Sequence, residues 1–148
     1  MPGIVSSSPL QTRYVPVGFM FFEGLHRLVA AGVHLPGLRD GDARRTALEA
    51  YPGFLAFALI GRRSYKNQAS ADRLDARRDI VDALVEGRPW PGLRLELPPA
   101  QRERLLEDAS GDRLDAMLCL VQAAWADARP GFGLPAPIDP IEGWIVTA

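Results

Sequence analysis

The stretch SGDRLDAMLCLVQAAWADA, residues 110–128, carries the strongest structural signal in the chain. As a helix it is apolar almost all round, because only Gln122 and the two ends are polar, and such helices are buried. Asp112 and Asp115 nevertheless lie in its first turns, three residues apart and therefore on one helix face. Two like charges buried this close are costly unless a cation or hydrogen bonds hold them. The stretch therefore predicts either a divalent-metal site or a helix cap.

Both interpretations use the same acidic residues. In the first, the two carboxylates are hard oxygen ligands for Mg²⁺ or Mn²⁺. In the second, Ser110 or Asp112 accepts hydrogen bonds from free amides of the first turn, and the acidic residues complement the helix dipole. With Asp112 as the cap, Asp115 occupies the third helical position, as the acid of a capping box does. On this stretch alone, capping is the favoured interpretation.

The pentapeptide DRLDA occurs a second time, at residues 72–76. There it is followed by Arg77, Arg78 and further charged residues, whereas the copy at residues 112–116 is followed by apolar ones. We therefore expect the first copy to belong to an amphipathic helix that directs Arg73, Arg77 and Arg78 outward.

Bulk properties indicate an ordinary globular protein. The chain has 148 residues, 47% hydrophobic and 24% charged residues, and a net charge of −1, which suggest a single domain at residues 1–148 and no global attraction to nucleic acid. Its one cysteine excludes a disulfide framework and fits a cytoplasmic location. No apolar run is long enough to span a membrane, and the N-terminus does not resemble a signal peptide.

Hydrophobic periodicity predicts a helix-dominated α/β fold with a small sheet. The expected helices are residues 18–31, 54–60, 69–86, 100–109 and 110–128. The expected strands are residues 45–51, which would place Glu49 near the strand end, and residues 142–147. Residues 1–16 and 87–97 contain prolines and glycines and are expected to be irregular, the latter with a weak edge strand as an alternative.

Four segments together resemble an uncharacterised bacterial and archaeal family of predicted nucleases with an RNase H-like fold. These segments are LEAYP at residues 48–52, SYKN at 64–67, GDRLDAMLCLVQAA at 111–124 and EGWI at 142–145. The last helix is also similar to that of the Holliday-junction resolvases, whose D-x-x-D-A motif carries two metal-binding aspartates. The resemblance covers most of the chain from about residue 9 onward.

The resemblance implies a role for four residues. Glu49 matches the family's glutamate ligand, and Asp112 and Asp115 match the acidic pair on the final helix. Lys66, the only lysine, matches the lysine of a Y-K motif, where a compact ammonium group neutralises a phosphate. These residues imply Mg²⁺- or Mn²⁺-dependent hydrolysis of phosphodiesters, with Glu49, Asp112 and Asp115 as metal ligands and all four as catalytic residues.

The sequence departs from the family at its start. Family members begin with a strand that carries an aspartate in a G-x-D context, followed by two further strands, and this chain shows no such opening. It resembles the C-terminal part of the fold, with residues 1–16 as a lead-in and the carboxylate that bridges the metals missing. Activity is therefore expected only if the site is completed. The open edge of the remaining sheet predicts a homodimer or larger assembly.

Two further functions compete with metal-dependent hydrolysis. One is an inert binding or assembly module that keeps the acidic cluster for folding. The other is nucleic-acid binding through a run of basic residues, for which a solvated basic face is the simpler explanation. The residues of this run are Arg62, Arg63, Lys66, Arg73, Arg77 and Arg78. Neither a phosphate-binding glycine loop, nor a Ser-His-Asp arrangement, nor Cys/His zinc spacing is present in the sequence.

Overall fold

The computed structural model describes residues 17–88, 92–141 and 143–147. The predictions for residues 1–16 lie outside these ranges. The same holds for residues 89–91 of the segment 87–97 and for Glu142 of the predicted terminal strand. The chain groups into two compact units, Met1–Glu49 with Pro135–Trp144 and Ala50–Leu134 with Ile145–Ala148. That grouping does not decide the number of domains, so a single domain stays a prediction.

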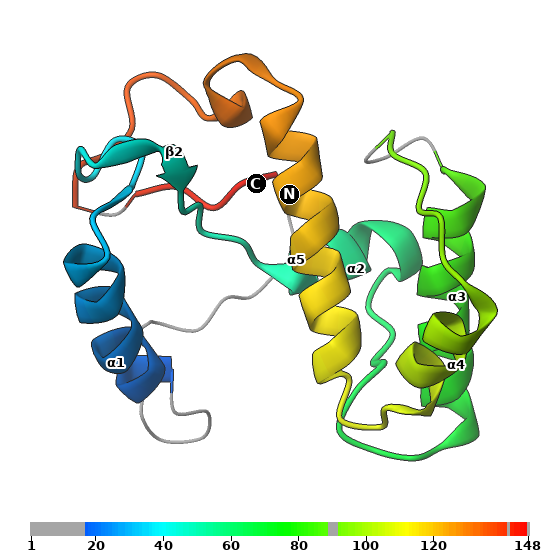
Figure 1. Cartoon of the computed structure of the whole chain (residues 1–148). Helices are drawn as coiled ribbons and strands as arrows, with labels where there is room; N and C mark the ends of the chain where they lie inside the picture. The colour runs from blue at the N-terminus through cyan, green and yellow to red at the C-terminus, as the bar shows by residue number, and fades with distance from the viewer. Residues whose placement is uncertain (1–16, 89–91, 142, 148) are drawn as a thin grey trace. The chain divides into compact units, whose positions relative to one another are not determined.

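The described residues form five α-helices and a two-stranded parallel sheet, which confirms the helix-dominated α/β class (Figure 1). No helix among them is long and apolar enough to cross a membrane. Four of the helices belong to the second unit, so the small sheet and the helical core lie in different units.

The first unit contains helix α1 (Val17–Ala30) and strands β1 (Val33–His34) and β2 (Asp42–Thr46). The two strands pair with Val33 opposite Asp42 and His34 opposite Thr46. The predicted strand at residues 45–51 is wrong beyond Thr46. Ala47 donates its amide to the carbonyl of His34 at 3.0 Å. His34 is the last residue of the two-residue strand β1, so the residues after Ala47 have no residue of β1 left to pair with.

Helix α1 exposes most of its apolar residues. Phe22 is 73% exposed, and Phe19 and Met20 are exposed to a similar extent. Phe19 and Phe22 are three residues apart and therefore lie on the same exposed face of α1.

The second unit is a helical core made of α2 (Pro52–Ile60), α3 (Ala71–Glu86), α4 (Pro99–Glu107) and α5 (Asp112–Asp127), followed by the short 3₁₀ helix η1 (Pro130–Gly133). Helix α5 packs against α2, α4 and η1, and α3 packs against α2 and α4 (Figure 1). The fully buried side chains at the centre of this core are those of Leu55, Ala76, Ile80, Val81, Leu114 and Leu118.

The starts and ends of these helices follow local sequence signals. Proline occupies the first turn of α2 and of α4, where the missing amide would have no helical partner. Gly87 ends α3 in the left-handed conformation and donates its amide to the carbonyls of the last turn. Each predicted helix is therefore present, with bounds that differ by a few residues.

Burial of α5 on all sides is a wrong expectation. Leu120 is 63% exposed, and the small residues Ala123 and Ala124 are exposed on the same helix. Leu114, Leu118 and the other buried residues of α5 pack into the core of the second unit. One face of α5 is therefore buried and the other is exposed, although both faces of the helix carry apolar residues.

The predicted terminal strand at residues 142–147 is also wrong. The described residues 143–147 show only isolated bridge positions, because Gly143 (φ +69°) and Thr147 (φ +71°) leave the extended conformation. Thr147 is instead buried against α5, where its Oγ1 accepts a hydrogen bond from Gln122 Nε2 at 2.7 Å.

Candidate functional site

Gly111 is the N-cap residue directly before helix α5 and has a left-handed backbone conformation (φ +83°). The amide of Arg113 donates to Asp108 Oδ2 at 2.9 Å, and the amide of Asp112 donates to Ser110 Oγ at 3.3 Å. The capping interpretation is therefore confirmed for Ser110 but wrong for Asp112, which accepts no first-turn amide among the described residues. Asp108, which precedes the predicted stretch, provides the stronger cap.

Asp108 acts as a charged cap. The hydrogen bond from the amide of Arg113 is the largest cause that lowers the pKa of this carboxyl, and a hydrogen bond from Ser110 adds to it. Ser110 Oγ lies 2.7 Å from Asp108 Oδ1 and 3.0 Å from Asp112 Oδ2. Its single proton can be donated to only one of these carboxylates at a time. Asp112 is exposed, and the hydroxyl of Ser110 that can donate to its carboxylate is shared with Asp108.

Asp115 is held by two neighbouring residues of the loop between α2 and α3. Tyr65 OH donates to Oδ1 at 2.6 Å, and Lys66 Nζ donates to Oδ2 at 2.6 Å. Tyr65 is buried, and both its burial and its hydrogen bond to Asp115 raise the pKa of its hydroxyl. The side chain of Lys66 is 41% exposed and that of Asp115 22%, so solvent reaches this ion pair. The ammonium group of Lys66 therefore compensates the negative charge of Asp115, whereas Asp112 has no cationic partner among the described residues.

The close approach of Lys66 to α5 depends on Gly111. A Cβ atom at Gly111 would lie 2.5 Å from Lys66 Cβ, which is too short for any side chain. Glycine is therefore required here both by its positive φ angle and by the space it leaves.

Two arginines of α3 fix the loop that carries Tyr65 and Lys66. Arg77 Nη1 donates to the carbonyl of Tyr65 at 2.8 Å and Arg77 Nε donates to the carbonyl of Leu106 at 2.8 Å. Arg73 donates to the carbonyl of Lys66. Arg77 is only 3% exposed, so the prediction that it faces outward is wrong. The reason is that the loop and α4 both present backbone carbonyls that need donors inside the unit.

The other basic residues of the predicted run are exposed but largely paired. Arg63 Nη2 donates to Asp79 Oδ2 at 2.6 Å, and Arg78 pairs with Asp75. Arg62 is exposed and forms no ion pair within the part of the chain that the structure describes. Carboxylate partners therefore offset the charge of Arg63, Lys66 and Arg78, half of the six cations in the run.

Glu49 is the last residue of the first unit, whereas Asp112 and Asp115 belong to the second. It is an exposed residue whose carboxyl is partly desolvated, and this desolvation raises its pKa. Neither unit, over its described residues, gathers three His, Cys, Asp or Glu side chains that could hold a metal ion. Convergence of Glu49 with the two aspartates stays a prediction.

The residues at the start of α5 suit a hard cation in a limited way. Asp112 and Asp115 offer two carboxylates in the first turn of the helix. Magnesium is usually bound by one or two carboxylates together with waters and substrate phosphates. Both oxygens of Asp115 already accept hydrogen bonds, so a cation would have to displace Lys66 or share Oδ2 with it.

These features define a helix-dominated α/β protein with an acid–lysine–tyrosine cluster at the start of a core helix. The chain belongs to the family described as Protein of unknown function (DUF429), whose model matches residues 26–140. Membership of an uncharacterised family, which the sequence resemblance indicates, is thereby confirmed. No curated protein and no solved structure matches the chain.

Sequence reasoning missed three residues of this cluster. Tyr65 appears in the sequence only as part of the SYKN motif, Asp108 lies before residues 110–128, and Gly111 is visible only as a glycine before the first aspartate. A glycine directly before an acidic helix start could have signalled the close approach, because that residue type tolerates it at least cost. The spacing of Arg77 from Ile80 and Val81, three and four residues, is the sequence signal that could have placed it on the buried face of α3.

Proposed function

We propose that the start of α5 is the acidic part of a divalent-metal-dependent phosphodiesterase site of RNase H-like type, acting as a nuclease. Asp112, Asp115 and Glu49 are the proposed ligands of Mg²⁺ or Mn²⁺, and Lys66 the proposed phosphate-binding residue. One observation carries the proposal: Lys66 Nζ lies 2.6 Å from Asp115 Oδ2, on the helix turn that also bears exposed Asp112. The ammonium group of Lys66 and the carboxylates of Asp112 and Asp115 therefore lie together in the solvent-accessible first turn of α5.

This arrangement suits a phosphodiester for an electrostatic reason. A phosphate group approaching two carboxylates is repelled unless positive charge lies between them. Lys66 supplies one such charge at a fixed position. The hydrogen bond of Tyr65 to Asp115 attaches its loop to α5, and the absence of a side chain at Gly111 allows the close approach. A bound cation would supply the rest and would stabilise the attacking and leaving oxygens of the phosphodiester.

Nucleic acid is the proposed substrate, with a smaller set of contacts than the sequence suggests. Arg62 is free to meet a phosphate, and Lys66 lies in the site itself. Arg63 and Arg78 would have to exchange their aspartate partners for phosphate oxygens, which costs little for exposed ion pairs.

A binding or assembly module without catalysis is the second candidate. The observation in its favour is that Tyr65 and Lys66 already satisfy both oxygens of Asp115. On this interpretation Asp115 serves to attach the loop to α5, and Asp112 has no chemical role.

Thermal unfolding in the presence of Mn²⁺ separates the two candidates. A cation that binds only the folded state raises the melting temperature, with a gain of about 2.7 kcal/mol when its concentration is 100 times the dissociation constant. We expect the rise in wild type and its loss in Asp112→Asn. Asp127→Asn at the other end of α5 is the matched control. No rise at millimolar Mn²⁺, or an equal rise in Asp112→Asn, would refute the metal site and leave the second candidate.

Glu49→Gln tests the third proposed ligand separately. This substitution keeps the size of the side chain and removes its charge, so we expect a smaller Mn²⁺-induced rise than in wild type. A rise of unchanged size would remove Glu49 from the ligand set without affecting the two aspartates.

We also propose that copies of the chain associate. An apolar sheet edge is not the reason, because the edge strand β2 reads DARRT and exposes its arginines. The support comes from α1, whose exposed Phe19, Met20 and Phe22 form an apolar surface. Light scattering at micromolar concentration should give a mass above that of the monomer, and Phe22→Gln should reduce it. A monomer mass for wild type would contradict the proposal.

A further inference from the structure

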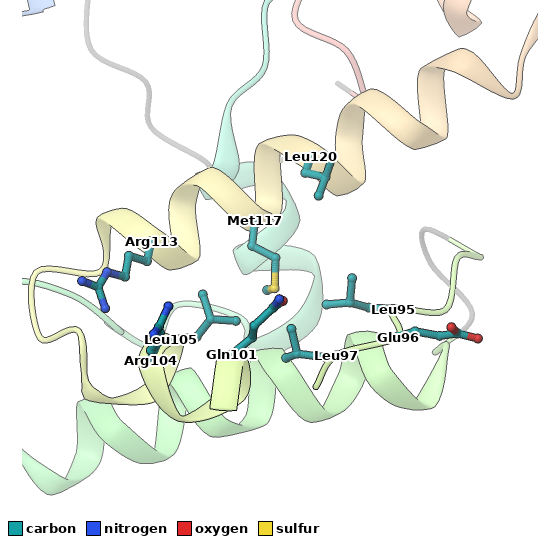
Figure 2. Close-up of a pocket in the computed structure, with 9 residues that line it drawn as sticks. All are labelled: Leu95, Glu96, Leu97, Gln101, Arg104, Leu105, Arg113, Met117 and Leu120. Carbon is teal, nitrogen blue, oxygen red and sulfur yellow. The ribbon is translucent and has the colours of Figure 1, made fainter. Parts of the chain in front are cut away.

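An apolar groove lies between α4, α5 and residues 95–97 of the second unit. Its volume is about 520 Å³, and five apolar side chains line it (Figure 2). They are Leu95, Leu97, Leu105, Met117 and Leu120. Small-molecule sites have volumes of about 300–1,000 Å³ and are lined mainly by apolar side chains with a few polar groups. The groove has the size and the apolar lining of such a site, and no residue of the proposed phosphodiesterase site lines it.

The charged residues of the groove are separated along its length. Arg104 of α4 and Arg113 of α5 lie toward one end, and Glu96 lies at the opposite end (Figure 2). Neither guanidinium group forms an ion pair or a side-chain hydrogen bond with any residue that the structure describes. Asp108 lies close enough to Arg113 for the guanidinium to help lower the pKa of its carboxyl, but the two side chains do not pair.

We propose that this groove binds a small amphiphilic carboxylate, with the carboxylate at Arg104 and Arg113 and the apolar body along Leu97, Met117 and Leu120. Guanidinium groups match planar carboxylates through paired hydrogen bonds, and two of them without ion-pair partners favour an anionic group. Exposed Leu120 supplies apolar surface that a bound chain would cover.

Methionine methyl groups provide a local reporter. The chain has three methionines, of which Met117 lines the groove and Met20 lies on exposed α1. In the full chain labelled with ¹³C-methyl methionine, sodium octanoate below its micelle concentration should shift the Met117 signal saturably and leave Met20 unchanged. The neutral alcohol 1-octanol should bind at least about tenfold more weakly, because it lacks the charge that the arginines recognise.

Substitution of the arginines completes the test. Arg104→Gln with Arg113→Gln should weaken octanoate binding about tenfold without changing the binding of 1-octanol. Both residues are exposed, so the variant should fold, and Arg62→Gln outside the groove is the control.

Four results would overturn the proposal. Equal binding of octanoate and octanol would remove the role of charge, and unchanged binding in the double variant would remove the arginines. Shifts of Met20 together with Met117, or at Met20 alone, would indicate general adsorption of amphiphiles. A change of mass in light scattering on mutating Leu120→Gln, with no shift of Met117 by octanoate, would show that a second copy covers the groove.

Discussion

Replacing Gly111 with alanine tests whether the start of α5 depends on close contact with Lys66. The new Cβ atom would lie 2.5 Å from Lys66 Cβ, and Gly111 has a φ angle of +83°. A left-handed conformation costs a residue with a Cβ atom about 1–2 kcal/mol. Displacement of Lys66 would also weaken its ion pair with Asp115, a partly exposed pair worth at most about 1 kcal/mol, and would strain the loop.

We therefore expect Gly111→Ala to lower the free energy of unfolding by about 3 kcal/mol in total, with a fall in melting temperature of roughly 6–12 °C. Gly131→Ala is the matched control, because Gly131 also has a positive φ angle (+59°) but no neighbouring group within 4 Å of the place that a Cβ atom would take. It should cost only about 1–2 kcal/mol, the cost of the left-handed conformation. Urea unfolding followed by far-ultraviolet circular dichroism measures both changes.

A Lys66→Gly background removes the Cβ atom that Gly111→Ala would meet. In that background the cost of Gly111→Ala should fall to about that of Gly131→Ala, because only the backbone conformation is then unfavourable. The same cost in both backgrounds would refute the steric argument and with it the role assigned to Gly111.

The remaining predictions concern the groups around the same cluster. The pKa of Tyr65 is raised in the folded state, so its contribution to stability is complete below the unfolded pKa of about 10 and falls by up to about 1.4 kcal/mol per pH unit above it. Urea unfolding between pH 9 and 11, in a Cys119→Ala background that removes the thiol, should show this fall in the parent and less of it in Tyr65→Phe; equal slopes would contradict the assignment. Arg77→Met should lower the free energy of unfolding by about 2 kcal/mol, because it leaves two buried carbonyls unpaired, whereas Arg78→Met should change it by less than about 0.5 kcal/mol. The pKa of Asp108 is lowered, so its stabilising effect is present above the unfolded pKa of about 3.9 and is lost as the pH falls through the folded pKa; Asp108→Asn should reduce the loss of stability between pH 5 and pH 3, and an unchanged loss would exclude Asp108 as the cap.

Much of the helical structure could be predicted from the sequence. The helices follow from periodicity and from proline and glycine at their ends, and these are local properties of the chain. The strands could not be predicted with the same success. Residues 45–51 and 142–147 have alternating patterns, but a strand needs a partner, and neither β1 nor the described part of the terminal segment offers one of that length.

The candidate site was predictable in its residue types and not in its contacts. The resemblance pointed to Lys66 and Asp115, and the structure places their charged groups 2.6 Å apart. The same reasoning treated Arg77 as a surface cation, although its guanidinium is buried between two backbone carbonyls. The spacing of Arg77 from Ile80 and Val81 already places it on the apolar face of the helix, and the tertiary structure supplies the two carbonyls that its buried guanidinium needs.

By itself, the sequence determined that the chain is a helix-dominated α/β protein with an acidic start to its last long helix, because periodicity, caps and charge spacing are local. The tertiary structure decided what holds those acids. Tyr65 and Lys66 lie 50 and 49 residues before Asp115 in the sequence, and each forms a hydrogen bond of 2.6 Å to its carboxylate. Gly111 leaves the space that Lys66 occupies. Contacts between such distant segments depend on how α2, α3 and α4 pack against α5, and no local pattern specifies that packing.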